Sequence, residues 1–182
     1  SNLDAKLRVE MRTAIKEIQN SIGITTVYVT HDQEEAMAVS DRIAVMKDGA
    51  IQHLGQPKDI YQRPANLFVA TFIGKTNVLK GTLDGSTLKI AGKYDINLTN
   101  IKDKNVKGNV TISIRPEEFV IDESQAKDGM KAFIDSSVFL GLNTHYFAHL
   151  ENGEKLEIVQ ESKIDNIIPK GTEVYLKVKQ DK

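Results

Sequence analysis

The sequence predicts an α/β segment over residues 1–75 followed by an all-β domain over residues 76–182. Up to residue 75, stretches with helical periodicity alternate with one apolar run that has the length and composition of a buried strand. Beyond residue 75 the helical periodicity fades, and short alternating stretches are separated by Gly, Asn and Asp turns. Many short strands at this spacing are typical of a small barrel or sandwich. The change in pattern places a domain boundary near residue 75.

The N-terminal part of the chain predicts an amphipathic helix that ends at Gly23, a residue suited to a left-handed helix stop. Its apolar side chains recur three and four residues apart and so share one stripe, while charged side chains occupy the remaining surface. The stripe consists of Leu7, Met11, Ala14, Ile15, Ile18 and Ile22.

The apolar run over residues 24–30 predicts a buried strand, and residues 33–40 predict a short helix. Asp32 stands where a helix N-cap is expected, and Glu35 follows three residues later, so the pair predicts a capping box. His31 therefore lies in the loop between a strand and a helix.

A hairpin is predicted next, with strands over 42–47 and 50–54 joined by the tight turn Asp48-Gly49. Pro is favoured in the first turn of a helix, and Asn is favoured at the N-cap. Two small helices therefore complete the segment, one beginning at Pro57 and running to about residue 62, and one capped by Asn66 and stopping at Gly74.

The second segment predicts short strands throughout. The alternating stretches lie at about 77–83, 86–91, 94–98, 107–114, 131–139, 144–150, 155–160 and 173–179.

Composition describes an ordinary globular chain, with 40% hydrophobic and 27% charged residues. Residues 1–75 hold nine acids and nine bases, which leaves 16 acids and 15 bases in residues 76–182, so charge gives no argument for nucleic acid. There is no cysteine, which is compatible with a reducing cytoplasm. No apolar run approaches the roughly 18 residues that span a bilayer, and no leader is expected at the start.

His31 is the first candidate for chemistry. The loop after a buried strand is where α/β folds bind their ligands, so an imidazole here indicates part of a nucleotide site. The alternative is a polar residue that merely satisfies its hydrogen bonds at a strand end. The chain carries no glycine loop of the kind that cradles phosphates.

Several segments together resemble the ATPase subunit of ATP-binding-cassette (ABC) transporters. Ser1-Asn2-Leu3-Asp4 resembles the D-loop of that family, and Val29-Thr30-His31-Asp32-Gln33-Glu34-Glu35-Ala36 resembles its switch-histidine segment. Asp41 to Gly49 resembles the last strands of the nucleotide-binding domain, and Gln56 to Gly74 its closing helices. Ile114-Arg115-Pro116-Glu117 and Phe139-Leu140-Gly141 resemble the transport-associated OB-like (TOBE) domain of maltose, polyamine and iron importers.

The resemblance implies an α/β remnant of an ABC nucleotide-binding domain over residues 1–75 and an OB-like TOBE domain over residues 76–182. It implies that His31 is catalytic, because a donor near the γ-phosphate stabilises its charge and orients the attacking water. It also implies that Asp4, with Ser1 and Asn2, contacts the nucleotide of the partner subunit across a homodimer interface. Asp4 has a simpler explanation too, since an acid in the first helical turn favours the helix dipole.

The implied parent is an ATPase that binds ATP and Mg²⁺ and powers a solute importer from the inner face of the cell membrane. Its partners are permease subunits, an extracellular solute-binding protein and a second ATPase subunit, with no nucleic acid. The phosphate loop, signature and Walker B carboxylates of the family do not occur in this sequence, so we expect a fragment that binds no ATP and hydrolyses none by itself. Gly74-Lys75-Thr76 imitates the end of a phosphate loop, but Val69 stands where glycine is required.

Two smaller constellations occur in the second segment. His145 and His149 would lie about 13 Å apart on a strand, too far for one ion, so no metal site is expected. Arg115-Pro116-Glu117-Glu118 is read as an exposed turn with a local ion pair, or as a regulatory or interface contact. The alternative for the whole segment is an independent OB-like module that binds a small oxyanion or an oligonucleotide. The transported solute is left open, with a slight preference for polyamine or iron over maltose.

Overall fold

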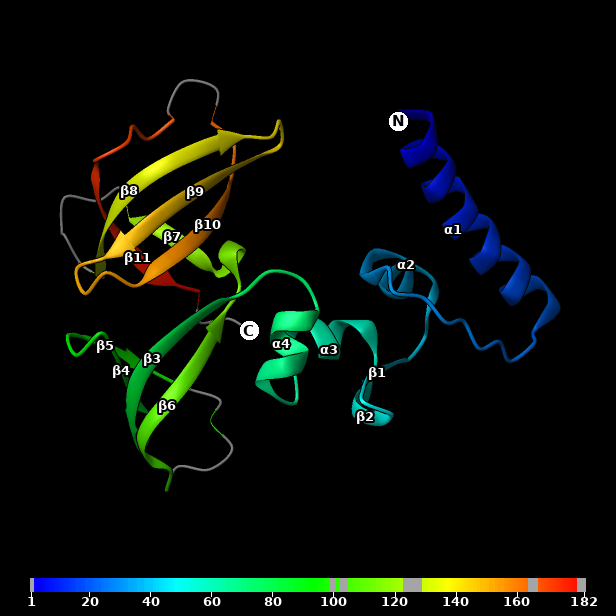
Figure 1. The fold of residues 1–182 in the computed structure, drawn as a ribbon, viewed down its shortest axis with the longest axis horizontal. Coiled ribbons are helices and arrows are strands. Elements are labelled where there is room, and N and C mark those ends of the chain that lie inside the picture. The colour runs from blue at the N-terminus through cyan, green and yellow to red at the C-terminus, as the bar shows by residue number, and fades with distance from the viewer. Residues whose placement is uncertain (1, 99–100, 102–104, 123–128, 164–166, 180–182) are drawn as a thin grey trace. The chain divides into compact units, whose positions relative to one another are not determined.

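The computed structural model describes residues 2–98, 101, 105–122, 129–163 and 167–179, with side chains from Lys6 onward. The chain divides into two compact units, Ser1–Gly74 and Lys75–Lys182. The first holds helices and one hairpin, and the second is built almost entirely of strands (Figure 1). No helix in the described part of the chain combines the length and apolarity that crossing a bilayer requires.

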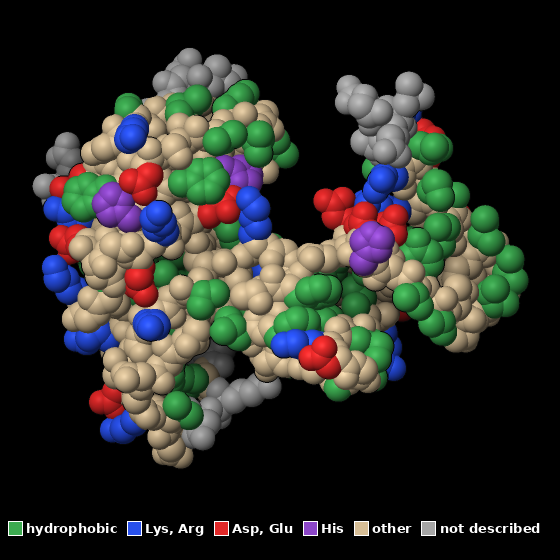
Figure 2. Space-filling view, viewed as in Figure 1, with side chains coloured by type: hydrophobic (Ala, Val, Ile, Leu, Met, Phe, Trp, Pro, Cys, Tyr) green, Lys and Arg blue, Asp and Glu red, His purple; other side chains and the backbone are tan. Residues whose placement is uncertain are grey.

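The helix α1 (Asn2–Ile22) confirms the predicted N-terminal helix, and Gly23 ends it at φ +69°. The helix is amphipathic as predicted, but none of its residues with a described side chain is buried. Leu7, Met11 and Ile22 remain 55%, 55% and 60% exposed. Hydrophobic side chains accordingly gather on the surface over α1 (Figure 2). The periodicity identified the helix correctly, yet the described residues of the first unit leave most of the apolar stripe exposed.

The strand predicted over residues 24–30 is wrong. These residues form neither strand nor helix, and Val27 and Val29 are 87% and 90% exposed. A strand requires a partner for its backbone N–H and C=O groups. In the first unit the strands β1 (Ile43–Lys47) and β2 (Ala50–Gly55) pair with each other, and residues 24–30 join no ladder. The apolar composition of residues 24–30 therefore indicates that these side chains could be buried. It does not provide a neighbouring strand for their backbone.

The helix α2 (Gln33–Val39) begins as predicted at Asp32, whose carboxylate accepts hydrogen bonds from the backbone N–H groups of Glu34 and Glu35. The second half of the predicted capping box is wrong. The N–H of Asp32 donates to Thr30 Oγ1 at 2.9 Å, and the Glu35 carboxylate accepts from the Thr30 hydroxyl at 2.8 Å instead. The threonine hydroxyl thus takes the place that Glu35 was expected to fill.

The rest of the first unit follows the predictions closely. β1 and β2 form the expected antiparallel hairpin, and Asp48 and Gly49 both have positive φ, as a tight hairpin turn requires. Pro57 starts α3 (Pro57–Gln62), and the Asn66 side chain caps α4 (Leu67–Phe72) by accepting from the N–H of Val69. The small core of this unit consists of Ile43, Val45, Ile60, Val69 and Ile73.

Two antiparallel sheets make up the second unit (Figure 1). The first has the order β5-β4-β3-β6, and the second has the order β10-β9-β8-β11-β7. A 3-10 turn, η1 (Pro116–Glu118), leads from one sheet to the other. The strands are β3 (Asn77–Asp84), β4 (Thr87–Ile90), β5 (Tyr94–Asn97), β6 (Lys107–Ile114), β7 (Phe119–Asp122), β8 (Met130–Phe139), β9 (Asn143–Leu150), β10 (Lys155–Glu161) and β11 (Glu173–Val178).

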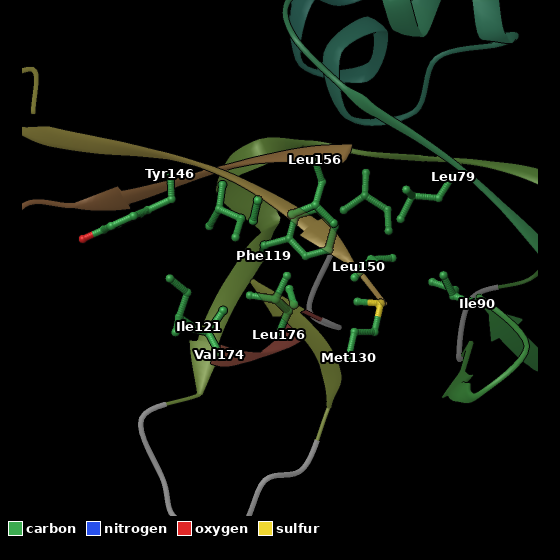
Figure 3. Packing of buried hydrophobic residues seen from close by; sticks show 14 of the residues in the cluster. Leu79, Ile90, Phe119, Ile121, Met130, Tyr146, Leu150, Leu156, Val174 and Leu176 are labelled. Atoms are coloured by element: carbon green, nitrogen blue, oxygen red, sulfur yellow. The ribbon is translucent and has the colours of Figure 1, made fainter. Parts of the chain in front are cut away.

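One hydrophobic core joins the two sheets of this unit. The ring of Phe119, which is 1% exposed, lies among Leu156, Leu150 and Leu176 (Figure 3). Leu79 and Ile90 of the other sheet belong to the same buried cluster. The buried residues alternate along each strand, as in β3 and β8, because successive side chains point to opposite faces. Each strand therefore contributes one face to the core.

The predicted fold class is confirmed: a small α/β remnant precedes a β-rich, OB-like domain. Every strand predicted in the second segment has a counterpart within a few residues. The strand β7 was missed because its four residues follow directly on Pro116-Glu117-Glu118, with no turn signal of their own. Its burial pattern alternates, but four residues are too short to stand out.

Candidate functional site around His31

His31 lies exposed in the loop immediately before α2. The loop is shaped by Asp32, whose carboxylate caps the helix. The hydrogen bond from the N–H of Glu35, helped by that of Glu34 and by the charge of Arg12, lowers the pKa of Asp32 below its usual value of 3.8. Asp32 is therefore ionised at neutral pH and keeps the start of α2, and with it the position of His31, well defined.

Two arginines of α1 face this loop. Arg12 lies 3.4 Å from Asp32 and 3.2 Å from Glu34, measured from its terminal nitrogens to the carboxylate oxygens. Arg8 lies 3.9 Å from Asp32. The Arg12 side chain is 16% exposed, so its charge is partly withdrawn from water and its pairing holds α1 against the start of α2. Its Nε is buried without a hydrogen-bond partner, so Arg12 is not fully satisfied by these carboxylates.

A second network lies on the other side of the loop. The Glu35 carboxylate accepts hydrogen bonds from the hydroxyls of Thr30, at 2.8 Å, and Tyr28, at 3.1 Å. The hydrogen bond to the Glu35 carboxylate raises the pKa of Tyr28, because it favours the protonated phenol. Residues before and after His31 are thus tied to the same helix.

The side chain of Gln33 reaches to the far end of the first unit. Its Nε2 donates to the carbonyl oxygen of Phe72, and its Oε1 accepts from the N–H of Gly74 at 2.7 Å. Sequence reasoning assigned no role to Gln33, Arg12 or Glu34. Nothing in a single sequence could indicate the contact between Gln33 and Gly74, because the two residues are 41 positions apart.

Together these residues line an open hollow of about 490 Å³ beside His31. Its walls are Arg8, Val9, Arg12, Asp32, Gln33 and Glu34. Both arginines already face carboxylates, so the exposed imidazole is the group most available to a ligand. No group of three or more His, Asp or Glu side chains in the described part of the chain is placed to hold a metal ion.

The other predicted site residues lie at the start of α1. Ser1 lies outside the described residues, and Asn2 and Asp4 belong to the first turn of α1 with their side chains outside what the structure describes. Their predicted contact with a nucleotide stays a prediction.

The interpretation of Arg115 as part of an exposed turn is wrong. Arg115 is 4% exposed, and its Nη1 donates to the carbonyl oxygen of Lys75 at 2.9 Å. Its backbone N–H is bound by the Glu118 carboxylate at 3.0 Å. Arg115 therefore stabilises the backbone at the start of the second unit, since a buried guanidinium with several donors can hold backbone carbonyls in place.

The two histidines of β9 bind different carboxylates. His145 Nδ1 lies 2.7 Å from Glu157 Oε1, and His149 Nδ1 lies 2.9 Å from Asp135 Oδ1. Each histidine thus belongs to a separate local pair.

Comparison with known proteins defines the class of the second unit first. Residues 112–182 match the TOBE domain family. The whole chain is 90% identical over 182 residues to the Fe(3+) ions import ATP-binding protein FbpC of Fusobacterium nucleatum subsp. nucleatum, covering 100% of this chain and 49% of that protein. The chain belongs to the family of ABC importer ATP-binding subunits and corresponds to their C-terminal part, including a TOBE domain.

Two more distant relatives are named for the import of other solutes. The chain is 47% identical over 137 residues to the xylose/arabinose import ATP-binding protein XacK of Haloferax volcanii, covering 73% of this chain and 35% of that protein. It is 40% identical over 169 residues to the spermidine/putrescine import ATP-binding protein PotA of Mesorhizobium japonicum, covering 89% of this chain and 45% of that protein. The chain thus spans about half the length, or less, of these relatives.

Proposed function

We propose that the full-length protein hydrolyses ATP to power an importer, with this chain supplying the switch histidine and a regulatory β-domain that contacts its twin in a homodimer. The main support is the 90% identity to an import ATP-binding protein across both compact units. The exposed position of His31, on a loop held by Asp32 and Arg12, is consistent with this role. Residues 1–75 then belong to the nucleotide-binding domain, and residues 76–182 form the TOBE domain.

The chemistry of this proposal needs only one group from the described site. ATP and Mg²⁺ supply the reacting phosphate and the charge that offsets its oxygens. The imidazole of His31 donates a hydrogen bond to the terminal phosphate and orients the attacking water, where negative charge develops. Asp32 does not take part, because Arg12 and the helix N–H groups already engage its carboxylate.

Within one subunit, the remaining contacts to ATP and Mg²⁺ come from outside this chain. The sequence has no glycine-rich phosphate loop, and the arginines beside His31 are paired with carboxylates. In the dimer, Asp4 with Ser1 and Asn2 reaches the nucleotide site of the partner subunit. This chain by itself is therefore expected to bind no nucleotide and to release no phosphate from ATP.

The solute is proposed to be ferric iron, because the 90% identical relative is an Fe(3+) ions import ATP-binding protein. The ATPase itself does not touch the solute, so selectivity would come from permease subunits and an extracellular binding protein. The subunit would lie at the inner face of the cell membrane, attached through those permease subunits.

Nucleic-acid binding is not proposed for the second unit. On its five-stranded sheet, Lys131 pairs with Glu173 at 2.8 Å and Lys177 pairs with Asp122 at 2.9 Å. Single-strand platforms need positive charge that is available to phosphates. These lysines are already neutralised by neighbouring carboxylates.

The test is phosphate release by the full-length subunit assembled with its permease subunits. His31→Ala is expected to lower the turnover number at least 100-fold while ATP binding changes little, since its donor acts on the transition state. His149→Gln is the control, because it changes a partly exposed histidine in the other unit, where it pairs with Asp135. Normal turnover in the His31→Ala protein would refute the catalytic role. Uptake of radiolabelled ferric iron, compared with spermidine and maltose, tests the solute.

A further inference from the structure

The side chain of Gln33 links the loop that carries His31 to the last residues of the first unit. Gln33 is the first residue of α2 and stands two positions after His31. Its amide bonds to the backbone on both sides of Ile73, donating to the carbonyl oxygen of Phe72 and accepting from the N–H of Gly74.

These two backbone groups are ones that the helix α4 cannot satisfy. Phe72 is the last residue of α4, so its carbonyl has no partner further along the helix. Gly74 comes after the helix, at φ +71°, where the chain turns away. A primary amide offers donors on its nitrogen and an acceptor on its oxygen, so Gln33 can satisfy both groups at once.

The chain is also anchored directly after Gly74, inside the second unit. The carbonyl oxygen of Lys75 accepts from the buried Arg115 at 2.9 Å, and the Thr76 hydroxyl lies 2.7 Å from that of Ser113. The backbone is therefore held by Gln33 up to Gly74 and by Arg115 from Lys75 onward. Little free chain separates these two anchors, so a displacement of residues 72–74 has few torsions in which to be absorbed.

We propose that Gln33 is a positioning residue that couples the His31 loop to the start of the β-domain. When His31 engages the terminal phosphate of a nucleotide, the start of α2 shifts with it, and Gln33 transmits this displacement to Phe72 and Gly74. The consequence is a change in the backbone that enters β3. The nucleotide-dependent part of this inference rests on the proposed function, whereas the contact of Gln33 with Gly74 does not.

The first experiment uses the full-length subunit without nucleotide and measures amide hydrogen exchange residue by residue by NMR. In Gln33→Ala, the amide of Gly74 is expected to exchange about tenfold faster, because it loses its acceptor. Gln33→Glu keeps an oxygen acceptor for Gly74 but loses the donor to Phe72, so Gly74 should stay close to the wild-type rate. Gln19→Ala is the matched control, since Gln19 also donates to a backbone carbonyl, that of Ile24, at 3.0 Å. Unchanged exchange at Gly74 in Gln33→Ala would overturn the inference.

The second experiment uses the full-length subunit with and without ATP and Mg²⁺, in a variant that binds ATP but does not hydrolyse it. Gln33 and Gln33→Ala are compared in this variant. In the wild-type background, nucleotide is expected to slow amide exchange in residues 72–79 several-fold. In Gln33→Ala, the affinity for ATP should stay within about twofold, while this slowing disappears. A merely structural role would alter exchange equally with and without nucleotide. Persistence of the slowing in Gln33→Ala would overturn the coupling.

The two experiments separate the possible failures. If the full-length subunit binds no ATP in either background, the proposed function fails and the nucleotide coupling fails with it. The exchange of Gly74 in the nucleotide-free subunit still decides whether Gln33 holds residues 72–74.

Discussion

The two compact units differ in how well each covers its own apolar side chains. Among the described residues, the core of Lys75–Lys182 contains 17 buried residues from both sheets, whereas that of Ser1–Gly74 contains five. In the first unit, α1 keeps an exposed apolar stripe, and Val27 and Val29 are almost fully exposed. Exposed apolar area of this size indicates a surface that another part of a protein covers. The second unit is thus self-sufficient, while the first depends on additional structure.

The largest effect that this comparison predicts is a difference between the separated units. A chain of residues 75–182 is expected to unfold in one cooperative transition in urea, followed by circular dichroism, because its core is complete. A chain of residues 1–74 is expected to show no such transition, because its small core cannot offset the conformational entropy of folding. A cooperative transition in 1–74, or none in 75–182, would break the comparison.

The next effect concerns the centre of the second core. Phe119→Ala removes a ring that is 1% exposed and lies between the two sheets, so the free energy of unfolding should fall by about 3–5 kcal/mol. Phe139→Ala is the control, since Phe139 is 57% exposed and its loss should change the unfolding free energy by less than about 0.5 kcal/mol. Urea denaturation of the 182-residue chain measures both. Equal effects of the two substitutions would contradict the assignment of Phe119 to the core.

A glycine in each unit sharpens the comparison further. A Cβ on Gly81 would lie 2.7 Å from both Ile112 Cδ1 and the carbonyl oxygen of Lys89, so Gly81→Ala should lower the unfolding free energy of the second unit by about 1–3 kcal/mol. A Cβ on Gly55 would lie no closer than 3.4 Å to its nearest neighbour, so Gly55→Ala should be close to neutral. Thermal unfolding followed by circular dichroism distinguishes the two. A neutral Gly81→Ala would show that β3 has room beside β4 and β6.

The same contrast explains what the sequence could predict. Elements defined by local signals were predicted correctly, such as the hairpin turn at Asp48-Gly49 and the helix caps at Asp32 and Asn66. These depend on φ values and on side-chain hydrogen bonds a few residues away. The strand over 24–30 failed because a strand depends on a distant partner, which periodicity does not reveal.

The candidate site shows the same division between local and distant signals. His31 could be selected from its place in the sequence, after an apolar run and before a helix cap. Gln33 and Arg115 could not, because the hydrogen bonds of their side chains reach backbone atoms 39 to 41 residues away. Nothing in the residue types distinguishes Gln33 from Gln19, or Arg115 from an exposed arginine. Only the folded chain shows which of them holds the junction at Gly74 and Lys75.

The smallest expected effect is a pH dependence confined to the second unit. Burial raises the pKa of Glu157, but the hydrogen bonds from Lys75 and His145 outweigh it, so the pKa lies below its usual value of 4.5. A carboxyl group whose pKa is lower in the folded state stabilises the fold above pH 4.5, and this stabilisation is lost as the pH falls through the lower, folded-state pKa. Because the Lys75 side chain is 67% exposed, solvent screens the pair and the contribution is only about 0.5–1 kcal/mol.

Glu157→Gln should therefore make the loss of stability between about pH 5 and pH 3 shallower than in the wild type. Glu151→Gln, which removes a more exposed carboxylate that pairs with Lys93 in the same unit, serves as the control and should change the acid limb less. Identical acid limbs for Glu157→Gln and the wild type, measured by urea denaturation at each pH, would show that the Lys75–Glu157–His145 cluster does not contribute to holding the start of the second unit.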